Sequence, residues 1–292
     1  MRLPFELPPP SGFSMPPVWD GQTFVIGDQK TSVLEYNENF GGWSDDLTTL
    51  HEEVAGDSHP IDIASRFDAI RQVKRYLPDE RGVIMEIGCS SGFFIQDLLK
   101  AFPKAVVIGS DVVKDPLYRL AKEIPGVPLI RFDLLQSPLP ERSIDVLIIL
   151  NVLEHIRDDI EAMKKSYSLL KPGGVLIVEV PAFPFLYDAY DIELLHFRRY
   201  SMEELHSKLI GAGFDLCRKS HLGFLLFPAF ALIKLRNKLF PPKTRQSVVR
   251  QYAGNTSNSG LIKSTMEFES RFLSEFSLPF GIRALTVARR PK

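Results

Sequence analysis

Residues Val83 to Phe94 read V-I-M-E-I-G-C-S-S-G-F-F, an apolar run that leads directly into a glycine-rich turn. Residues 83–87 have the apolar, β-branched character of a strand buried on both faces, and residues 94–102 carry apolar side chains at helical spacing. Gly88 and Gly92 therefore lie in a strand-to-helix turn, where the missing Cβ lets the backbone bend sharply and lets a ligand approach main-chain N–H groups. The segment predicts a βα unit with a nucleotide-type ligand at its turn.

An acidic residue follows the next strand. Residues 105–110 form a second apolar run, and Asp111 stands at its carboxyl end, where such units place an acid that accepts hydrogen bonds from ribose hydroxyls. The turn reads G-C-S-S-G and lacks the third glycine that close approach of a pyrophosphate requires. Glu86, just before the turn, would also repel a pyrophosphate but suits a ligand with an amino group. These features favour a cofactor other than a dinucleotide.

Five motifs in this order resemble those of the class I S-adenosylmethionine-dependent methyltransferases. They are E-I-G-C-S-S-G, Asp111, the F-D pair that ends at Asp133, N-V-L-E-H over residues 151–155 and L-K-P-G-G over residues 170–174. The resemblance covers roughly residues 81–214 and includes small-molecule methyltransferases. It implies S-adenosylmethionine as the cofactor and methyl transfer as the activity.

The resemblance also implies which residues contact the cofactor. Glu86 is expected near the methionine amino group, Asp111 at the ribose and Asp133 at the adenine amino group, although an Asp after a strand is also a common helix N-cap. Cys89 is expected to supply a small side chain rather than a nucleophile. The full set of expected contacts is Glu86, Gly88, Cys89, Gly92, Asp111, Val112, Asp133, Leu134, Asn151 and Val152.

The alternation of strands and helices predicts an α/β fold with a doubly wound, mostly parallel sheet of seven strands. The expected strands cover residues 83–87, 105–110, 128–132, 144–150, 174–180 and 214–220, with the last within 277–289. The expected helices cover residues 92–102, 114–123 and 158–170, and a further helix begins at Ser201 with a capping box. The resemblance implies that the last strand pairs antiparallel beside the sixth.

The chain divides into three predicted parts. Residues 1–75 form an N-terminal arm and helical cap, in which the first 30 or so residues are irregular or packed as an arm and helices begin near Ser44 and Asp62. Residues 76–220 and 277–292 form the cofactor-binding core. Residues 221–276 form an insertion.

The insertion begins with an uncharged run, residues 222–233, that is followed by Lys234, Arg236 and Lys238. The run is too short to span a bilayer, which takes about 20 residues. Three alternatives remain open: contact with an anionic membrane surface, a lid over an apolar acceptor, or a helix buried against the sheet.

Composition narrows the class of protein. The chain has 292 residues and the share of hydrophobic residues that is ordinary for a globular protein. Its net charge of -1 argues against nucleic acid as a partner. Its two cysteines, Cys89 and Cys217, make neither a disulfide framework nor a cysteine-rich zinc site, so no metal site is expected. Cysteine usage and a proline-broken N-terminus favour the cytoplasm, with the inner face of the membrane as an alternative. The oligomeric state stays open.

Two histidines are candidates for the chemistry. If the acceptor is a hydroxyl, a general base is wanted, and His155 and His196 both follow predicted strands at the cofactor end of the sheet. His155 has a structural role as its alternative. The segment around His196, D-A-Y-D-I-E-L-L-H-F-R-R-Y, also supplies Arg198 and Arg199.

The same segment is expected to contact the acceptor. Arg198 and Arg199 would hold a carboxylate or phosphate by paired hydrogen bonds, with Tyr200 beside them, unless the arginines pair with Asp188, Asp191 and Glu193 instead. Trp43 is expected either to close the site from the cap or to anchor packing.

The sequence thus predicts a methyltransferase for a small-molecule or lipid- or glycan-linked acceptor, with transfer to oxygen. The segment from Val180 to the apolar run resembles bacterial methyltransferases associated with cell-surface glycan or isoprenoid-type acceptors. Two alternatives remain: a cofactor-binding module without turnover that acts as a partner at a membrane, and a nicotinamide-dependent dehydrogenase, which Glu86 and the missing glycine disfavour.

Overall fold

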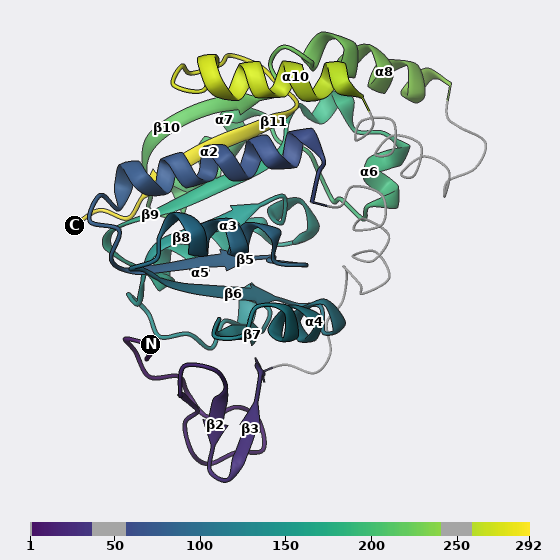
Figure 1. Cartoon of the computed structure of the whole chain (residues 1–292). Helices are drawn as coiled ribbons and strands as arrows, with labels where there is room; N and C mark the ends of the chain where they lie inside the picture. The colour runs from purple at the N-terminus through teal and green to yellow at the C-terminus, as the bar shows by residue number, and fades with distance from the viewer. Residues whose placement is uncertain (1, 37–56, 241–258) are drawn as a thin grey trace.

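The centre of the molecule is an eight-stranded sheet with the order β10-β11-β9-β8-β5-β6-β7-β4 (Figure 1). The computed structural model describes residues 2–36, 57–240 and 259–292. The strands of the sheet are β4 (Val33–Glu35), β5 (Val83–Ile87), β6 (Val106–Asp111), β7 (Leu129–Arg131), β8 (Ile144–Leu150), β9 (Leu170–Pro181), β10 (Asp215–Leu222) and β11 (Arg283–Arg289). Neighbouring strands from β9 to β4 run parallel, while β11 is antiparallel to both β9 and β10. The predicted sheet is confirmed, and β4 extends it by one edge strand.

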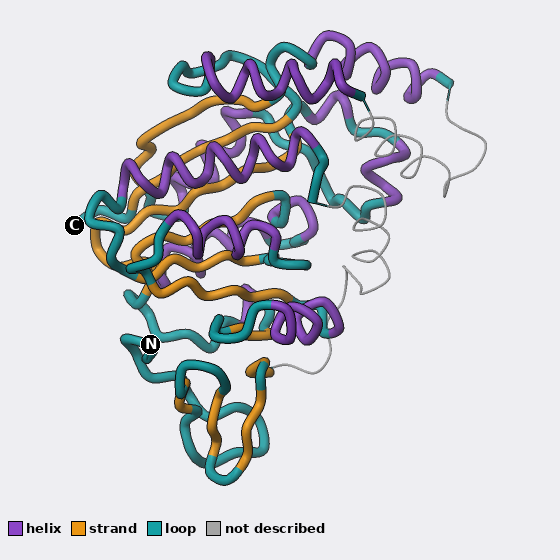
Figure 2. Tube along the Cα trace, viewed as in Figure 1, coloured by secondary structure: helices purple, strands orange, loops and turns teal. Residues whose placement is uncertain are grey.

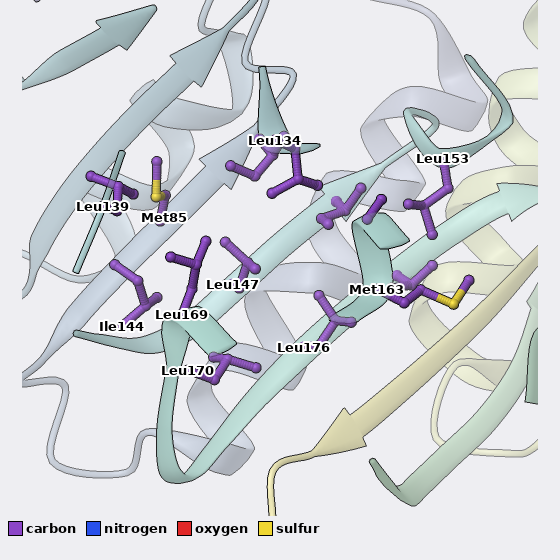
Figure 3. Packing of buried hydrophobic residues seen from close by; sticks show 14 of the residues in the cluster. Met85, Leu134, Leu139, Ile144, Leu147, Leu153, Met163, Leu169, Leu170 and Leu176 are labelled. Atoms are coloured by element: carbon purple, nitrogen blue, oxygen red, sulfur yellow. The ribbon is translucent and has the colours of Figure 1, made fainter. Parts of the chain in front are cut away.

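Helices cover both faces of the sheet (Figure 2). One face packs against α2 (Pro60–Tyr76), α3 (Phe93–Ala101) and α4 (Asp115–Glu123), and the other against α5 (Asp159–Leu169) and α7 (Met202–Gly211). Strands covered on both sides are almost entirely apolar. All five residues of β5 are buried, and Glu86 is the one among them that is not apolar. Figure 3 shows the second face, where Leu147 and Leu176 of the strands lie beside Met163 and Leu169 of α5.

The sheet order places a crevice beside β5. The chain passes from β5 through β6 to β7 on one side and then crosses to β8 on the other side of β5, so the loops that follow β5 and β8 diverge. Gly88 follows β5 with a φ of 80°, and a Cβ at this position would lie 2.3 Å from Cγ2 of Val152, which follows β8. Only glycine therefore fits at the point where the two loops separate.

Short helical segments carry side chains to this edge of the sheet. They follow β7, β8 and β9 and are η1 (Leu134–Gln136), η2 (Leu153–His155), η3 (Pro184–Leu186) and α6 (Ala189–Glu193). Asp188 and Asp191 form a capping box that fixes the first turn of α6. Ser201 is the N-cap of α7, as predicted, because its hydroxyl accepts from the N–H of Glu204.

The N-terminal segment differs from the prediction of an irregular arm. It forms a small antiparallel sheet of β1 (Val18–Trp19), β2 (Phe24–Ile26) and β3 (Gln29–Thr31), in which the Trp19 and Phe24 rings pack 4.7 Å apart. The turn between β1 and β2 is held by the Asp20 carboxylate, which accepts from the N–H groups of Gln22 and Thr23. Strands of two or three residues are too short to produce a recognisable alternation, which is why the sequence pattern did not predict them.

The insertion is helical in its described part. It consists of α8 (Phe227–Leu239), α10 (Gly260–Phe268) and the π-helical turn η4 (Glu269–Leu273), and its helices lie beyond β10 and β11 (Figure 1). Glu269 ties the insertion to the end of β10, because its carboxylate accepts from the N–H groups of Gly223 and Leu225. In the described ranges no helix is both long and apolar enough to cross a bilayer. The helix predicted from Ser44 lies outside the described residues.

The contact between Gly88 and Val152 leads to a stability prediction. Gly88→Ala forces a side chain into a left-handed backbone and against a stiff β-branched neighbour, so we expect it to lower the free energy of unfolding by about 1–3 kcal/mol. Urea unfolding followed by circular dichroism measures this. Gly211→Ala is the matched control, since no atom lies within 4 Å of the Cβ it would add in α7. Equal stability of the two variants would contradict the role of the contact.

Candidate functional site

A cavity of about 970 Å³ opens at the carboxyl ends of the parallel strands. One side consists of the loops that follow β5, β6, β7 and β8. The other side includes the end of β9, the segment around α6, the insertion helices α8 and α10, and the starts of α2 and β11. The cavity therefore joins the predicted cofactor region to the segment that carries His196, within a single space.

Most of the predicted cofactor residues line this cavity. The lining members are Gly88, Asp111, Val112, Asp133, Leu134, Asn151 and Val152. Glu86 and Cys89 are buried behind this wall, and Gly92 is the N-cap of α3, where a Cβ would collide with Leu120. Glu86, Cys89 and Gly92 thus lie behind the cavity wall, and their contacts with a cofactor stay predictions.

The N–H groups of the glycine-rich turn are used within the protein. Those of Gly88 and Cys89 both donate to the carbonyl oxygen of Ser110, at 2.8 and 3.0 Å. The N–H of Ser90 donates to Oδ2 of Asp111 at 2.7 Å. These three donors are engaged by the end of β6, so a ligand that approaches the turn would have to use other N–H groups of the helix N-terminus, and that contact stays a prediction. The turn offers space for a ligand but little attraction for an anion, which agrees with the missing dinucleotide motif.

Asp111 is held in one orientation at the cavity wall. Its Oδ1 accepts from the N–H groups of Val112 at 2.7 Å and Val113 at 3.2 Å.

Burial, reinforced by the nearby charge of Asp111, raises the pKa of Glu86 well above its usual range. Oε2 of Glu86 has no hydrogen-bond partner among the described residues. A carboxylate left in this state favours a nearby ligand that carries a donor or a positive charge.

Asp133 and Asn151 owe their positions to the local backbone. Oδ1 of Asp133 accepts from the N–H of Leu135 at 2.9 Å, so the residue caps η1 and also lines the cavity. Both interpretations of Asp133 are compatible with this arrangement. Asn151 has a φ of 53°, a left-handed conformation that asparagine tolerates better than most residues, and its side-chain amide donates to Oε1 of Glu179 at 3.3 Å.

The two predicted catalytic histidines lie together in the cavity wall. The His155 and His196 rings meet edge to face, with centroids 4.7 Å apart. Nδ1 of His196 lies 2.9 Å from Oδ1 of Asp191. Burial opposes ionisation of Asp191, but the hydrogen bond from His196 and the charges of Arg199 and Lys234 outweigh it and hold the Asp191 pKa far below its usual range.

An ionised Asp191 determines the protonation of His196. Because a carboxylate only accepts, Nδ1 of His196 carries the proton and Nε2 keeps its lone pair. Burial lowers the pKa of His196 in spite of its carboxylate partner, which favours the neutral ring. His196 is therefore set up to accept a proton or to bind a ligand through Nε2.

The predicted acceptor residues separate into two groups. Arg199 lines the cavity and donates to Asp191 at 2.8 Å. Arg198 and Tyr200 instead contact Asp159, at 2.9 and 2.8 Å, and neither belongs to the cavity wall. Because Asp159 engages both side chains, the structure does not bring Arg198 and Tyr200 to the cavity, and their contact with the acceptor stays a prediction. Trp43 lies outside the described residues.

Lys234 is a site residue that the sequence did not reveal. It projects from α8 into the cavity wall, where Nζ lies 2.6 Å from Oδ1 of Asp188 and 3.0 Å from Oδ2 of Asp191. The expectation that this lysine faces an anionic membrane is wrong, since only 5 % of it is exposed. One feature of the sequence could have indicated this role: Lys234 directly follows the uncharged run. A charged residue that is buried with such a run needs a partner of opposite charge.

The insertion supplies an apolar wall to the same cavity. Leu226, Phe230 and Ile233 come from the α8 segment, and Leu261 and Ile262 come from α10. Of the three alternatives for the uncharged run, this arrangement fits a lid over an apolar ligand best. Glu154, which the sequence had placed only within the N-V-L-E-H motif, also faces this chamber.

Comparisons with known proteins agree with the fold and the motifs. Residues 85–178 match the family model described as "Methyltransferase domain". A Mycolicibacterium smegmatis protein described as "Probable S-adenosylmethionine-dependent methyltransferase" is 30% identical over 135 residues, which are 46% of this chain and 52% of that protein. Malonyl-[acyl-carrier protein] O-methyltransferase of Halalkalibacterium halodurans is 25% identical over 40% of this chain and 46% of its own length. The chain spans about half the length of these relatives.

A solved structure extends the likeness beyond the matched segment. The S-adenosylmethionine-dependent methyltransferase of Mesorhizobium loti superposes with a TM-score of 0.52 at 19% identity and covers 79% of this chain and all of that protein. At this identity the likeness concerns the fold alone.

The buried pairing of Lys234 gives a second stability prediction. Lys234→Met leaves Asp188 without its cation and weakens the partner set of Asp191, so we expect a loss of about 3–5 kcal/mol of unfolding free energy. The matched control is Lys238→Met, one turn later on the same helix, whose side chain is exposed, and for which we expect less than about 0.5 kcal/mol. Thermal and urea unfolding of both variants check this. Comparable losses would show that Lys234 contributes no more than a surface lysine.

Proposed function

Because the chain belongs to the class I S-adenosylmethionine-dependent methyltransferase superfamily, we propose that it transfers a methyl group from S-adenosylmethionine to a hydroxyl of an acceptor with a substantial apolar part. A small molecule or a lipid- or glycan-linked molecule fits this description. The observation that supports the proposal is the single cavity, which joins the predicted cofactor residues to a chamber with two histidines and an apolar wall.

The residues present fit the cofactor. Only glycine fits beside Val152, so the turn presents no side chain to the cavity, and the buried Oε2 of Glu86 has no partner among the described residues. Asp111 ends β6 and Asp133 follows the adjacent strand β7, as ribose and adenine contacts require. When bound, S-adenosylmethionine supplies an electrophilic methyl group on a sulfonium. The protein would hold it with Asp111, Asp133, Leu134, Asn151 and Val152, and with Glu86 near its amino group.

The chamber beyond the cofactor region supports an amphiphilic acceptor. Its wall from α8 and α10 is apolar, whereas Glu154, His155, His196 and Arg199 line its polar end. An apolar body would lie under the insertion helices and direct a hydroxyl toward the histidines. Methyl transfer then requires alignment, exclusion of water and removal of the hydroxyl proton, in which His155 and His196 both take part.

Contact with an anionic membrane stays a prediction for the outer side of α8. Leu232, Leu235 and Leu239 are exposed there, beside the exposed Arg236. Exposed apolar and basic side chains on one helix are typical of binding to an anionic lipid surface. A lipid-linked acceptor would then reach the cavity from that surface.

Calorimetry tests the cofactor assignment. We expect the protein to bind S-adenosylmethionine but not NAD⁺, because the turn N–H groups are engaged and the third glycine is missing. Asp111→Asn removes charge-assisted hydrogen bonds to the ribose and should weaken S-adenosylmethionine binding about 10- to 100-fold. Asp215→Asn at the exposed start of β10 is the control and should bind like the unaltered protein. Binding of NAD⁺ alone would overturn the assignment.

Transfer of labelled methyl groups tests turnover. Cell extract separated into lipid and aqueous fractions, incubated with the protein and methyl-labelled cofactor, should yield a labelled acceptor. His196→Gln should reduce the initial rate at least about 100-fold with little change in cofactor affinity. His206→Gln is the control, because this histidine contacts Thr286 away from the cavity. Cofactor binding without any labelled product would favour the alternative of a module without turnover.

A further inference from the structure

Three side chains of metal-ligand type converge in the acceptor chamber. Glu154, His155 and His196 each offer one ligand atom, and these atoms all lie within 4.8 Å of one another. Two of them come from η2 and the third from the segment after α6, so tertiary packing brings them together. Within the described ranges they form the one such group of histidine, cysteine and acidic side chains.

Glu154 is buried in a state that calls for a positive partner. Glu154 is 0% exposed, and neither of its carboxylate oxygens has a hydrogen-bond partner among the described residues. Burial raises the Glu154 pKa to about 8. The nearby cations are engaged elsewhere, since Arg199 donates to Asp191 and Arg283 donates to Glu179 and Asp62. An uncompensated buried carboxylate is costly unless it binds a cation or becomes protonated.

His196 already has the support that metal-binding histidines usually have. It donates its Nδ1 proton to Asp191 at 2.9 Å, which fixes the ring and leaves Nε2 unprotonated. Metal-ligating histidines typically give their other N–H to a carboxylate in this way. Asp191 is held in turn by Arg199 and Lys234, so the orientation of His196 does not depend on a ligand.

We propose that Glu154, His155 and His196 bind a divalent transition-metal ion, such as Zn²⁺, Mn²⁺ or Fe²⁺, in the acceptor chamber. Two imidazoles and one carboxylate are typical of sites that keep a position open for substrate. Atoms at the corners of a triangle with 4.8 Å sides lie about 2.8 Å from its centre, against about 2.1 Å in a formed site. Inward movement of each ligand by less than about 1 Å therefore closes the site.

The ion gives the two histidines a defined task in the reaction. This step rests on the proposed function. The acceptor hydroxyl oxygen binds at the open position, where its pKa falls and its proton leaves to solvent. The oxyanion then attacks the methyl carbon, so that a C–O bond forms, the C–S bond breaks with its electron pair on sulfur, and a neutral thioether remains.

Metal titration of the full chain, without cofactor or acceptor, tests the site. Protein stripped with a chelator is titrated with Zn²⁺ by calorimetry and with Co²⁺ by visible absorption. We expect one equivalent to bind, with the absorption bands of Co²⁺ bound to nitrogen and oxygen. Glu154→Gln and His196→Gln should each weaken binding at least about 100-fold, and Asp191→Asn about 10- to 100-fold. His206→Gln is the matched control and should bind normally.

Thermal unfolding separates loss of a ligand from loss of the fold. Glu154→Gln replaces an unpaired carboxylate with a neutral group of the same shape, so the metal-free variant should unfold at the same temperature as the metal-free protein or higher. Zn²⁺ should raise the unfolding temperature of the unaltered protein by several degrees and leave that of the variant unchanged. Binding of less than about 0.2 equivalents, or equal binding by Glu154→Gln, overturns the site.

The catalytic part has its own outcome. Full methyl transfer by metal-free protein would overturn the role of the ion in the reaction, even with one equivalent bound. Loss of transfer on chelation, restored by one equivalent of Mn²⁺ or Zn²⁺, supports it. Absence of S-adenosylmethionine binding would instead contradict the proposed function and would leave the metal titration, which needs no cofactor, to decide the site.

Discussion

The acceptor side of this protein depends on one buried carboxylate, that of Asp191. Its Oδ1 accepts from His196 and Arg199, and its Oδ2 accepts from Lys234 and from the backbone N–H of Asp188. The residue is 0% exposed, so its charge is tolerable only while these donors are in place. One side chain therefore links α6, the segment after it and the insertion helix α8, and it also fixes the tautomer of His196.

A short loop after β8 connects the two halves of the cavity. Asn151 and Val152, at its start, face the predicted cofactor region, and Glu154 and His155, one turn later, face the acceptor chamber. The switch in strand order beside β5 places this loop opposite Gly88, where no Cβ would fit against Val152. A methyl donor and an acceptor bound to the two halves would therefore meet at a single loop, without a hinge between domains.

The core elements were predictable because each is a long apolar segment with a clear period. Strands β5 and β8 agree with the predicted bounds to the residue, and α3 and α4 agree within one residue. The small sheet β1–β3 was not predictable, because its strands are too short to carry a period. Arg198 and Arg199 are adjacent in sequence and alike in chemistry, yet only Arg199 reaches the cavity. That choice depends on where Asp159 and Asp191 lie after folding, which no local pattern encodes.

The sequence by itself determined the doubly wound sheet and the loops that line the predicted cofactor half of the cavity. Glycines, acids and strand ends in that half act through the backbone over a few residues, so spacing alone carries the information. The tertiary structure decided the acceptor half: the convergence of Glu154, His155 and His196, the pairing of Lys234 with Asp191 across 43 positions, and the position of the insertion over the cavity. Those features are side-chain contacts between distant segments, and their energies depend on burial and mutual orientation, which exist only once the chain has packed.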